Sequence, residues 1–302
     1  MNSTGREAVD RTGTSMRAFQ TIAVKPLSGS VGAEIEGVDL AKALPQQTFA
    51  EIHQAFLDHS VIFFRDQKLT PEQQIAFVGR FGRVMHDPFM KSPEGRPEVM
   101  VVVKEKDERE VFAEGWHSDN TYLERPPLGS CLYALEVPPY GGDTLYASQY
   151  RAYEALSPGM KKMLDGMKAI HEPHSYASGI LGGYYERHRS MKLRNDAVME
   201  AALKLSTEQP VVRTHPETRR KALYVNAAYT VRFKDWTEAE SRPVLDYLYA
   251  HCVRPEFTCR FRWTPGALAF WDNRCVQHNP VNDYQGHRRE MHRVTAEGDR
   301  PI

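Results

Sequence analysis

The stretch EGWHSDNTYLERPP, residues 114–127, places a histidine and an aspartate one residue apart behind a tryptophan. In a β-strand, side chains two residues apart point to the same face, so His117 and Asp119 would aim together. A neutral imidazole and a carboxylate suit a divalent metal such as Fe(II). An isolated H-x-D pair also occurs by chance as an ordinary polar edge. The pair therefore indicates a metal site only if a further ligand lies elsewhere in the chain.

The C-terminal region supplies a candidate for that ligand. In GALAFWDNRCVQHNPVNDYQGHRREMHRVT, residues 266–295, His278 follows the apolar run ALAF. Two histidines and one carboxylate make the facial triad of non-haem Fe(II) oxygenases, which leaves coordination positions open for a cosubstrate and O₂. Residues as far apart as Asp119 and His278 can meet in a closed β-sandwich, where distant strands lie side by side. A metal site built from these three residues is therefore consistent with a closed β-sandwich.

Short extended runs separated by glycine, proline and asparagine turns fill most of the chain, and helical patterns interrupt them. We expect strands within residues 21–27, 32–40, 61–65, 98–104, 129–137, 210–216, 222–226, 257–263, 267–272 and 289–298. We expect helices within residues 45–59, 70–82, 150–167 and 237–252. This order predicts a mainly β fold with helices, an antiparallel sandwich or jelly roll.

The chain organisation indicates one domain, which we place at residues 21–302. Residues 1–20 are polar and weakly patterned, and we expect them to be a flexible lead-in. They contain no apolar segment of a secretory signal, and no run of 18 apolar residues occurs anywhere in the sequence. The polar, glycine-containing segment 171–206 reads as a long excursion, a candidate lid over a site.

Charge and cysteine content narrow the function classes. Lys plus Arg and Asp plus Glu number 39 each, which gives no support for a nucleic-acid or membrane partner. The four cysteines, Cys131, Cys252, Cys259 and Cys275, form no C-x-x-C pair, and we interpret them as buried thiols in a reducing compartment. We therefore expect a cytoplasmic protein.

Four ordered motifs carry a resemblance to a known family. W-H-x-D ends at Asp119, G-G-D-T covers residues 141–144, W-D-N-R-x-x-x-H covers 271–278, and R-R-x-M-H-R covers 288–293. The chain resembles the taurine dioxygenase/TfdA family of Fe(II)- and 2-oxoglutarate-dependent dioxygenases from about Thr21 onward. The resemblance implies a double-stranded β-helix, the cupin-like jelly roll, flanked by α-helices. It also implies Fe(II), 2-oxoglutarate as cosubstrate, and O₂.

Several residues take roles from this resemblance. His117, Asp119 and His278 would hold the iron. Arg289, eleven positions after His278, would grip the distal carboxylate of 2-oxoglutarate, a task that suits the planar guanidinium fork. Thr144 would add a hydroxyl to the same carboxylate, and Arg293 would lie nearer the substrate. The RTHP run with His215 also matches the family, without a chemical role that we can assign.

The substrate is an open point of the resemblance. The taurine branch has a histidine directly before a proline, whereas VMHDPF places Asp87 there and His86 one position earlier. Ala113 also replaces the asparagine expected before the W-H pair. Phe89 and Tyr229 are candidate walls of the substrate pocket, and residues 87–99 resemble the aryloxyalkanoate branch. The resemblance implies hydroxylation of a small organic anion, a sulfonate or a carboxylate, with release of succinate and CO₂.

Two other functions stay open at this point. One is a non-oxidative metal-binding jelly-roll protein, and the other is a biosynthetic oxygenase acting on a larger substrate beneath the 171–206 excursion. Whichever function holds, we expect the protein to be a homo-oligomer, a dimer or a tetramer. The intact Asp119 and the position of Arg289 favour an enzyme over a binding protein.

Overall fold

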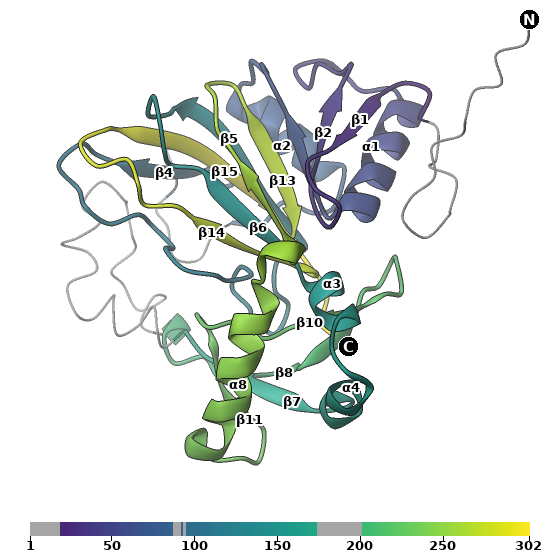
Figure 1. Cartoon of the computed structure of the whole chain (residues 1–302). Helices are drawn as coiled ribbons and strands as arrows, with labels where there is room; N and C mark the ends of the chain where they lie inside the picture. Colours follow the sequence, from purple (N-terminus) through teal and green to yellow (C-terminus); the bar gives the residue numbers. More distant parts are fainter. Residues whose placement is uncertain (1–18, 87–91, 93–94, 174–200) are drawn as a thin grey trace, which may run out of the picture.

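The structure of the protein is a computed structural model that describes residues 19–86, 92, 95–173 and 201–302 (Figure 1). Its largest element is a seven-stranded sheet in the order β1-β2-β3-β13-β5-β15-β4. Only β2 and β3 pair in parallel; the other neighbours are antiparallel. The strands are β1 (Ala23–Pro26), β2 (Ala33–Glu36), β3 (Val61–Phe64), β4 (Met100–Lys104), β5 (Gly129–Glu136), β13 (Leu268–Asp272) and β15 (Arg289–Ala296).

A three-stranded sheet faces the inner side of the large sheet. It consists of β12 (Thr258–Phe261), β6 (Thr144–Ser148) and β14 (Val276–Pro280), in that order. Phe63, Trp271 and Met291 from the large sheet share one buried core with Tyr146 and Phe261 from the small sheet. The two sheets are therefore packed face to face, and side chains on their inner faces meet.

Two helices cover the outer face of the large sheet, α1 (Gln46–His59) and α2 (Pro71–Gly79). Phe56 of α1 stacks on Phe270 of β13 with ring centroids 4.7 Å apart. Helix α2 begins at a capping box, in which the Thr70 hydroxyl accepts from the Gln73 amide and the Gln73 side chain accepts from the Thr70 amide.

The lower part of Figure 1 has a core of its own, which includes Leu164, Val211, Phe233 and Leu248. A three-stranded sheet there has the order β11-β7-β8, and a hairpin pairs β9 with β10. The elements are α3 (Gln149–Glu154), α4 (Pro158–Leu164), β7 (Lys168–His171), β8 (Thr207–Pro210), β9 (Val212–Thr214), β10 (Lys221–Leu223), β11 (Thr230–Phe233), α8 (Glu238–Cys252) and the 3₁₀-helix η2 (Pro255–Phe257).

The predicted mainly β fold with helices is confirmed, and each predicted strand and helix region overlaps an element of its type. One helical region, 150–167, is divided into α3 and α4 because Ser157 caps a new helix that starts at Pro158. Strands β6, β7, β8, β11 and β14 were not predicted. The lead-in and the 171–206 excursion lie largely outside the described residues.

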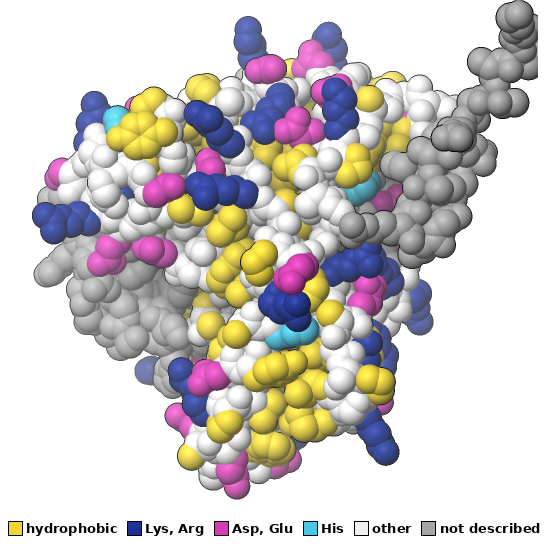
Figure 2. All heavy atoms as spheres, viewed as in Figure 1, with side chains coloured by type: hydrophobic (Ala, Val, Ile, Leu, Met, Phe, Trp, Pro, Cys, Tyr) yellow, Lys and Arg dark blue, Asp and Glu magenta, His cyan; other side chains and the backbone are white. Residues whose placement is uncertain are grey.

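The surface and the thiols bear on the predicted class of protein. All four cysteines are buried and free, as expected. On the face shown in Figure 2, basic and acidic side chains are interspersed. In the described part of the chain, no helix combines the length and apolarity needed to cross a membrane.

Candidate metal and cosubstrate site

Strand pairing brings the two candidate histidine ligands together. The His117 amide donates to the His278 carbonyl (3.1 Å), and the His278 amide donates to the His117 carbonyl (2.8 Å). We expected His117 and Asp119 to lie on one face of the same strand, and this prediction is wrong for Asp119. The extended backbone ends after this bridge, and Asp119 lies in a turn. The Ser118 hydroxyl donates to the Val276 carbonyl (2.7 Å) and so joins this loop to β14.

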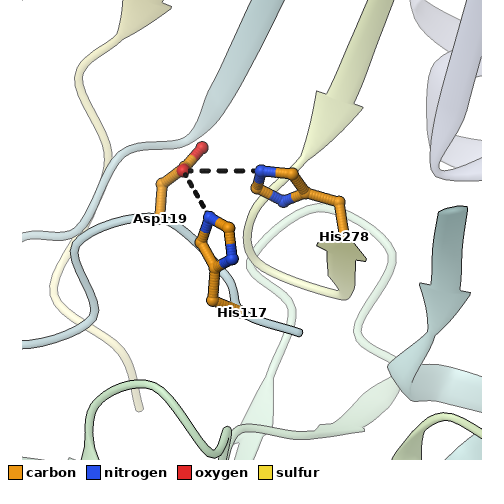
Figure 3. A group of neighbouring side chains, drawn as sticks. All are labelled: His117, Asp119 and His278. Atoms are coloured by element: carbon orange, nitrogen blue, oxygen red, sulfur yellow. Dashed lines mark ion pairs between the residues drawn. The ribbon is translucent and has the colours of Figure 1, made fainter. Parts of the chain in front are cut away.

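The three side chains nevertheless converge (Figure 3). Asp119 Oδ1 lies 3.7 Å from Nε2 of both His117 and His278, and the candidate ligand atoms all lie within 4.8 Å of one another. All three residues are buried. Nδ1 of His117 is 2.8 Å from the Gly115 carbonyl, which assigns the proton to Nδ1 and leaves the Nε2 lone pair facing Asp119.

The second oxygen of Asp119 is bound from the large sheet. Oδ2 accepts from the Ser130 hydroxyl of β5 (2.8 Å) and from Nη2 of Arg293 on β15 (2.6 Å). The Asp119 amide donates to Oδ1 of Asn273 (3.2 Å), which also accepts from the Trp271 indole (3.0 Å). The W-D-N run therefore orients the aspartate, and Oδ1 is directed between the histidines.

The charge states suit metal binding. Burial alone would raise the pKa of Asp119, but the positive charge of Arg293 and the nearby His278 and His117 together hold that pKa well below its usual range. Burial lowers the pKa of both His117 and His278. The site thus offers one carboxylate and two neutral imidazoles, the protonation states that a metal requires of its ligands. The residues present fit Fe(II).

A second part of the site gathers around Trp263. Arg289 on β15 is buried, and its Cζ lies 5.7 Å from the centroid of the Trp263 ring. The Trp263 indole donates to the Thr144 hydroxyl (3.0 Å), so that hydroxyl keeps its own hydrogen available for donation. Nε and Nη2 of Arg289 have no hydrogen-bond partner in the described part of the chain. A buried guanidinium with unused donors fits a carboxylate ligand.

The predicted substrate residues do not all lie beside the triad. The ring of Tyr229 lies edge-on to His117, with centroids 6.3 Å apart, and it also packs on Tyr122. His86 is exposed, lies 3.7 Å from the Glu98 carboxylate, and lines a surface hollow with Arg83 and Arg125. Asp87 and Phe89 lie outside the described residues. Tyr229 and Arg293 therefore adjoin the triad, whereas the described contacts of His86 are with other residues.

The RTHP motif has a structural role that the sequence did not reveal. His215 Nδ1 accepts from the amides of Glu217 (3.2 Å) and Thr218 (3.1 Å), so Nε2 carries the proton and donates to Asp272 (3.0 Å). Arg274 donates to both oxygens of Asp272, at 2.8 and 2.7 Å. His215, Asp272 and Cys275 lie close enough to resemble a metal site. The ring nitrogens of His215 and the carboxylate oxygens of Asp272 already have hydrogen-bond partners. We therefore interpret the group as one that stabilises the W-D-N-R turn.

Comparisons with known proteins identify the family of the chain. A family profile described as "Taurine catabolism dioxygenase TauD, TfdA family" matches residues 23–295. The alpha-ketoglutarate-dependent sulfate ester dioxygenase of Pseudomonas putida is 35% identical over 284 residues, which cover 92% of this chain and 90% of that protein. The alkylsulfatase of Acinetobacter baylyi is 33% identical over 282 residues, covering 93% and 86% respectively.

A solved structure titled as a taurine dioxygenase from Burkholderia xenovorans superimposes with a TM-score of 0.78 and 36% identity, covering 94% of this chain and 93% of that one. Fold, triad and family profile together define a non-haem iron oxygenase that uses 2-oxoglutarate. This chain belongs to the TauD/TfdA family of dioxygenases, which depend on Fe(II), 2-oxoglutarate and O₂.

Proposed function

We propose that this dioxygenase hydroxylates a small organic anion at the carbon that bears a sulfate ester or sulfonate group. The observation that carries the proposal is the Arg293 guanidinium, which lies against Asp119 at the triad and is mostly buried. A cation held there favours an anionic substrate. The sulfate ester dioxygenase and the alkylsulfatase among its relatives support a sulfur oxyanion.

In this proposal each residue has a stated task. His117, Asp119 and His278 hold Fe(II), and Ser130 and Arg293 fix the carboxylate of Asp119. Arg289 and Thr144 bind the distal carboxylate of 2-oxoglutarate. When bound, the iron and 2-oxoglutarate supply the oxidising chemistry with O₂, and succinate and CO₂ are released. Tyr229 and Arg293 border the substrate, whereas His86, Asp87 and Phe89 remain candidate substrate-binding residues.

The expected products distinguish the two substrate types. Hydroxylation replaces a C–H bond with C–OH on the carbon attached to the sulfur-containing group. In a sulfate ester, the hydroxyl then loses its proton, a carbonyl forms, and the C–O bond breaks to release an aldehyde and sulfate. In a sulfonate, the same collapse breaks the C–S bond and releases sulfite.

The test uses the Fe(II)-loaded full chain with 2-oxoglutarate and O₂. Linear alkyl sulfates, alkanesulfonates of matched chain length and aryloxyacetates are compared for succinate, sulfate and sulfite. We expect stoichiometric succinate and sulfate or sulfite, and no turnover by Asp119→Ala. Turnover of aryloxyacetates alone would contradict the sulfur oxyanion, and full turnover by Asp119→Ala would contradict the triad.

Of the two alternative functions that the sequence left open, one is now set aside and the other stays open. The non-oxidative metal-binding protein is set aside because the chain belongs to a dioxygenase family and has the complete triad. A larger substrate would depend on the 171–206 excursion, of which residues 174–200 lie outside the described part.

We also infer features of the whole molecule. The two facing sheets, built from strands distant in sequence, support a double-stranded β-helix within a single domain at residues 21–302. Four free, buried thiols support a reducing compartment such as the cytoplasm. We propose a homo-oligomer, a dimer or tetramer, and light scattering coupled to size-exclusion chromatography tests this.

A further inference from the structure

Lys104 is a buried cation that the proposed function does not use. It is the last residue of β4, and it lies directly opposite Arg289 in the antiparallel pairing of β4 with β15. Cross-strand partners point to the same face of a sheet, so the two side chains are neighbours on the inner face. Lys104 is only 3% exposed and Arg289 only 5%.

Neither cation has its donors satisfied. Nζ of Lys104, like Nε and Nη2 of Arg289, has no hydrogen-bond partner in the part of the chain that the structure describes. Nζ instead lies 4.7 Å from the centroid of the Tyr284 ring. Burial lowers the pKa of Lys104, as expected for an ammonium removed from water.

Acidic groups lie nearby, but none of them forms a hydrogen bond with Lys104 Nζ or with Nε and Nη2 of Arg289 among the described residues. Glu108 and Asp107 act on Lys104 through space, but Glu108 Oε2 accepts from the Glu105 amide (2.7 Å). Asp143 acts on Arg289, yet its Oδ2 accepts from Arg260 (2.6 Å). Two adjacent buried cations with unused donors are strongly disfavoured unless an anion joins them.

The Tyr284 ring lies next to Lys104 and to the G-G-D-T turn that leads to Thr144. A Cβ added to Gly142 would lie 3.2 Å from the Tyr284 ring, so the G-G-D-T turn packs closely on that ring. The turn leads into Thr144, whose hydroxyl is bonded to Trp263 beside Arg289. The ammonium, the guanidinium and the hydroxyl are thus linked through Tyr284, Trp263 and the G-G-D-T turn, and a carboxylate accepts hydrogen bonds from donors of all three kinds.

We propose that Lys104 is a second cationic contact for the distal carboxylate of 2-oxoglutarate, opposite Arg289. The inference rests on the proposed role of Arg289 and adds a residue to that subsite. The pairing register assigns Lys104 to the cosubstrate and not to the substrate. Arg293, the candidate substrate contact, lies four residues along β15 and pairs with Met100.

The test measures binding without turnover. Mn(II)-loaded protein is titrated calorimetrically with 2-oxoglutarate and with pyruvate, which lacks the distal carboxylate. Lys104→Met removes the charge and keeps the side-chain length, and Lys106→Met is the matched control on the exposed turn after β4. We expect Lys104→Met to weaken 2-oxoglutarate binding at least tenfold, to leave pyruvate binding unchanged, and to be largely rescued in Lys104→Arg.

Other outcomes separate this inference from the proposed function. Unchanged 2-oxoglutarate binding by Lys104→Met, with weakened binding by Arg289→Met, would overturn the inference and leave the function standing. Unchanged binding by both variants would overturn the whole cosubstrate subsite. Equal weakening for pyruvate would also overturn the inference, because pyruvate cannot contact that subsite. Lys104→Gln, measured in the same way, replaces Lys104→Met if the latter does not fold.

Discussion

At the scale of single residues, Asp119 divides its two carboxylate oxygens between two tasks. Oδ1 faces the histidine nitrogens, and Oδ2 is held by Ser130 and Arg293 from the large sheet. Such outer contacts fix the orientation of a ligand and raise its affinity for metal. The H-x-D pattern identified the aspartate, but nothing in the local sequence pointed to Ser130.

Ser130→Ala is therefore expected to weaken Mn(II) or Fe(II) binding by about tenfold, the lower end of the effect of such outer contacts. Calorimetric titration of the metal-free protein measures the change. Thr295→Val is the control, because Thr295 approaches the Ser130 hydroxyl at 3.4 Å and is not itself bonded to Asp119. Equal affinities for Ser130→Ala and the parent would remove Ser130 from this positioning role.

At the scale of elements, helix α2 forms hydrogen bonds with two strands that carry site residues. Gln74 donates to the carbonyls of Cys131 on β5 (3.2 Å) and His292 on β15 (3.1 Å). We predicted a helix within residues 70–82, and in the structure it begins at Pro71 with a capping box formed by Thr70 and Gln73. A local signal thus positions a helix that supports residues far along the chain.

Removing the cap should cost stability without affecting chemistry. Thr70→Ala leaves the Gln73 amide without its side-chain acceptor and should lower the free energy of unfolding by about 1 kcal/mol. Urea unfolding measures this, and Thr70→Ser should restore most of it. A large loss of metal affinity in folded Thr70→Ala would show that the outer helix has more than a supporting role.

At the scale of the whole molecule, buried titratable groups make stability depend on pH. His171 is fully buried, its Nδ1 lies 2.8 Å from the Thr121 hydroxyl, and its Nε2 lies 3.2 Å from the Thr230 hydroxyl. Burial lowers the pKa of His171 to about 3. The unfolded chain takes up this proton near pH 6.5, whereas the folded chain does not until about pH 3.

Acid should therefore destabilise the native protein through His171. Between these two pKa values the unfolded state binds more protons, so the free energy of unfolding falls as pH falls, by up to about 1.4 kcal/mol per pH unit. His171→Gln should remove this contribution. Unfolding curves of both proteins at pH 7, 5.5 and 4.5 test it, and a parent-to-variant difference that does not change with pH would contradict the prediction.

Sequence patterns predicted most elements because their signals are local. Helical patterns within residues 45–59 and 70–82 predicted α1 and α2. Strands β6 and β14 were not predicted, although they carry Thr144 and His278. The segment VQHNP is polar and short, and it is a strand only because β6 supplies its hydrogen bonds and Trp271 packs on His278.

The sequence by itself determined the class of enzyme, the candidate ligands and the helical regions, since each of these depends on residue types at short or motif-defined spacings. Only the tertiary structure decided that Asp119 lies in a turn, that His215 pairs with Asp272, and that Lys104 faces Arg289. The two pairs join residues 57 and 185 positions apart. They arise from strand register and sheet packing, which no local window of the chain contains.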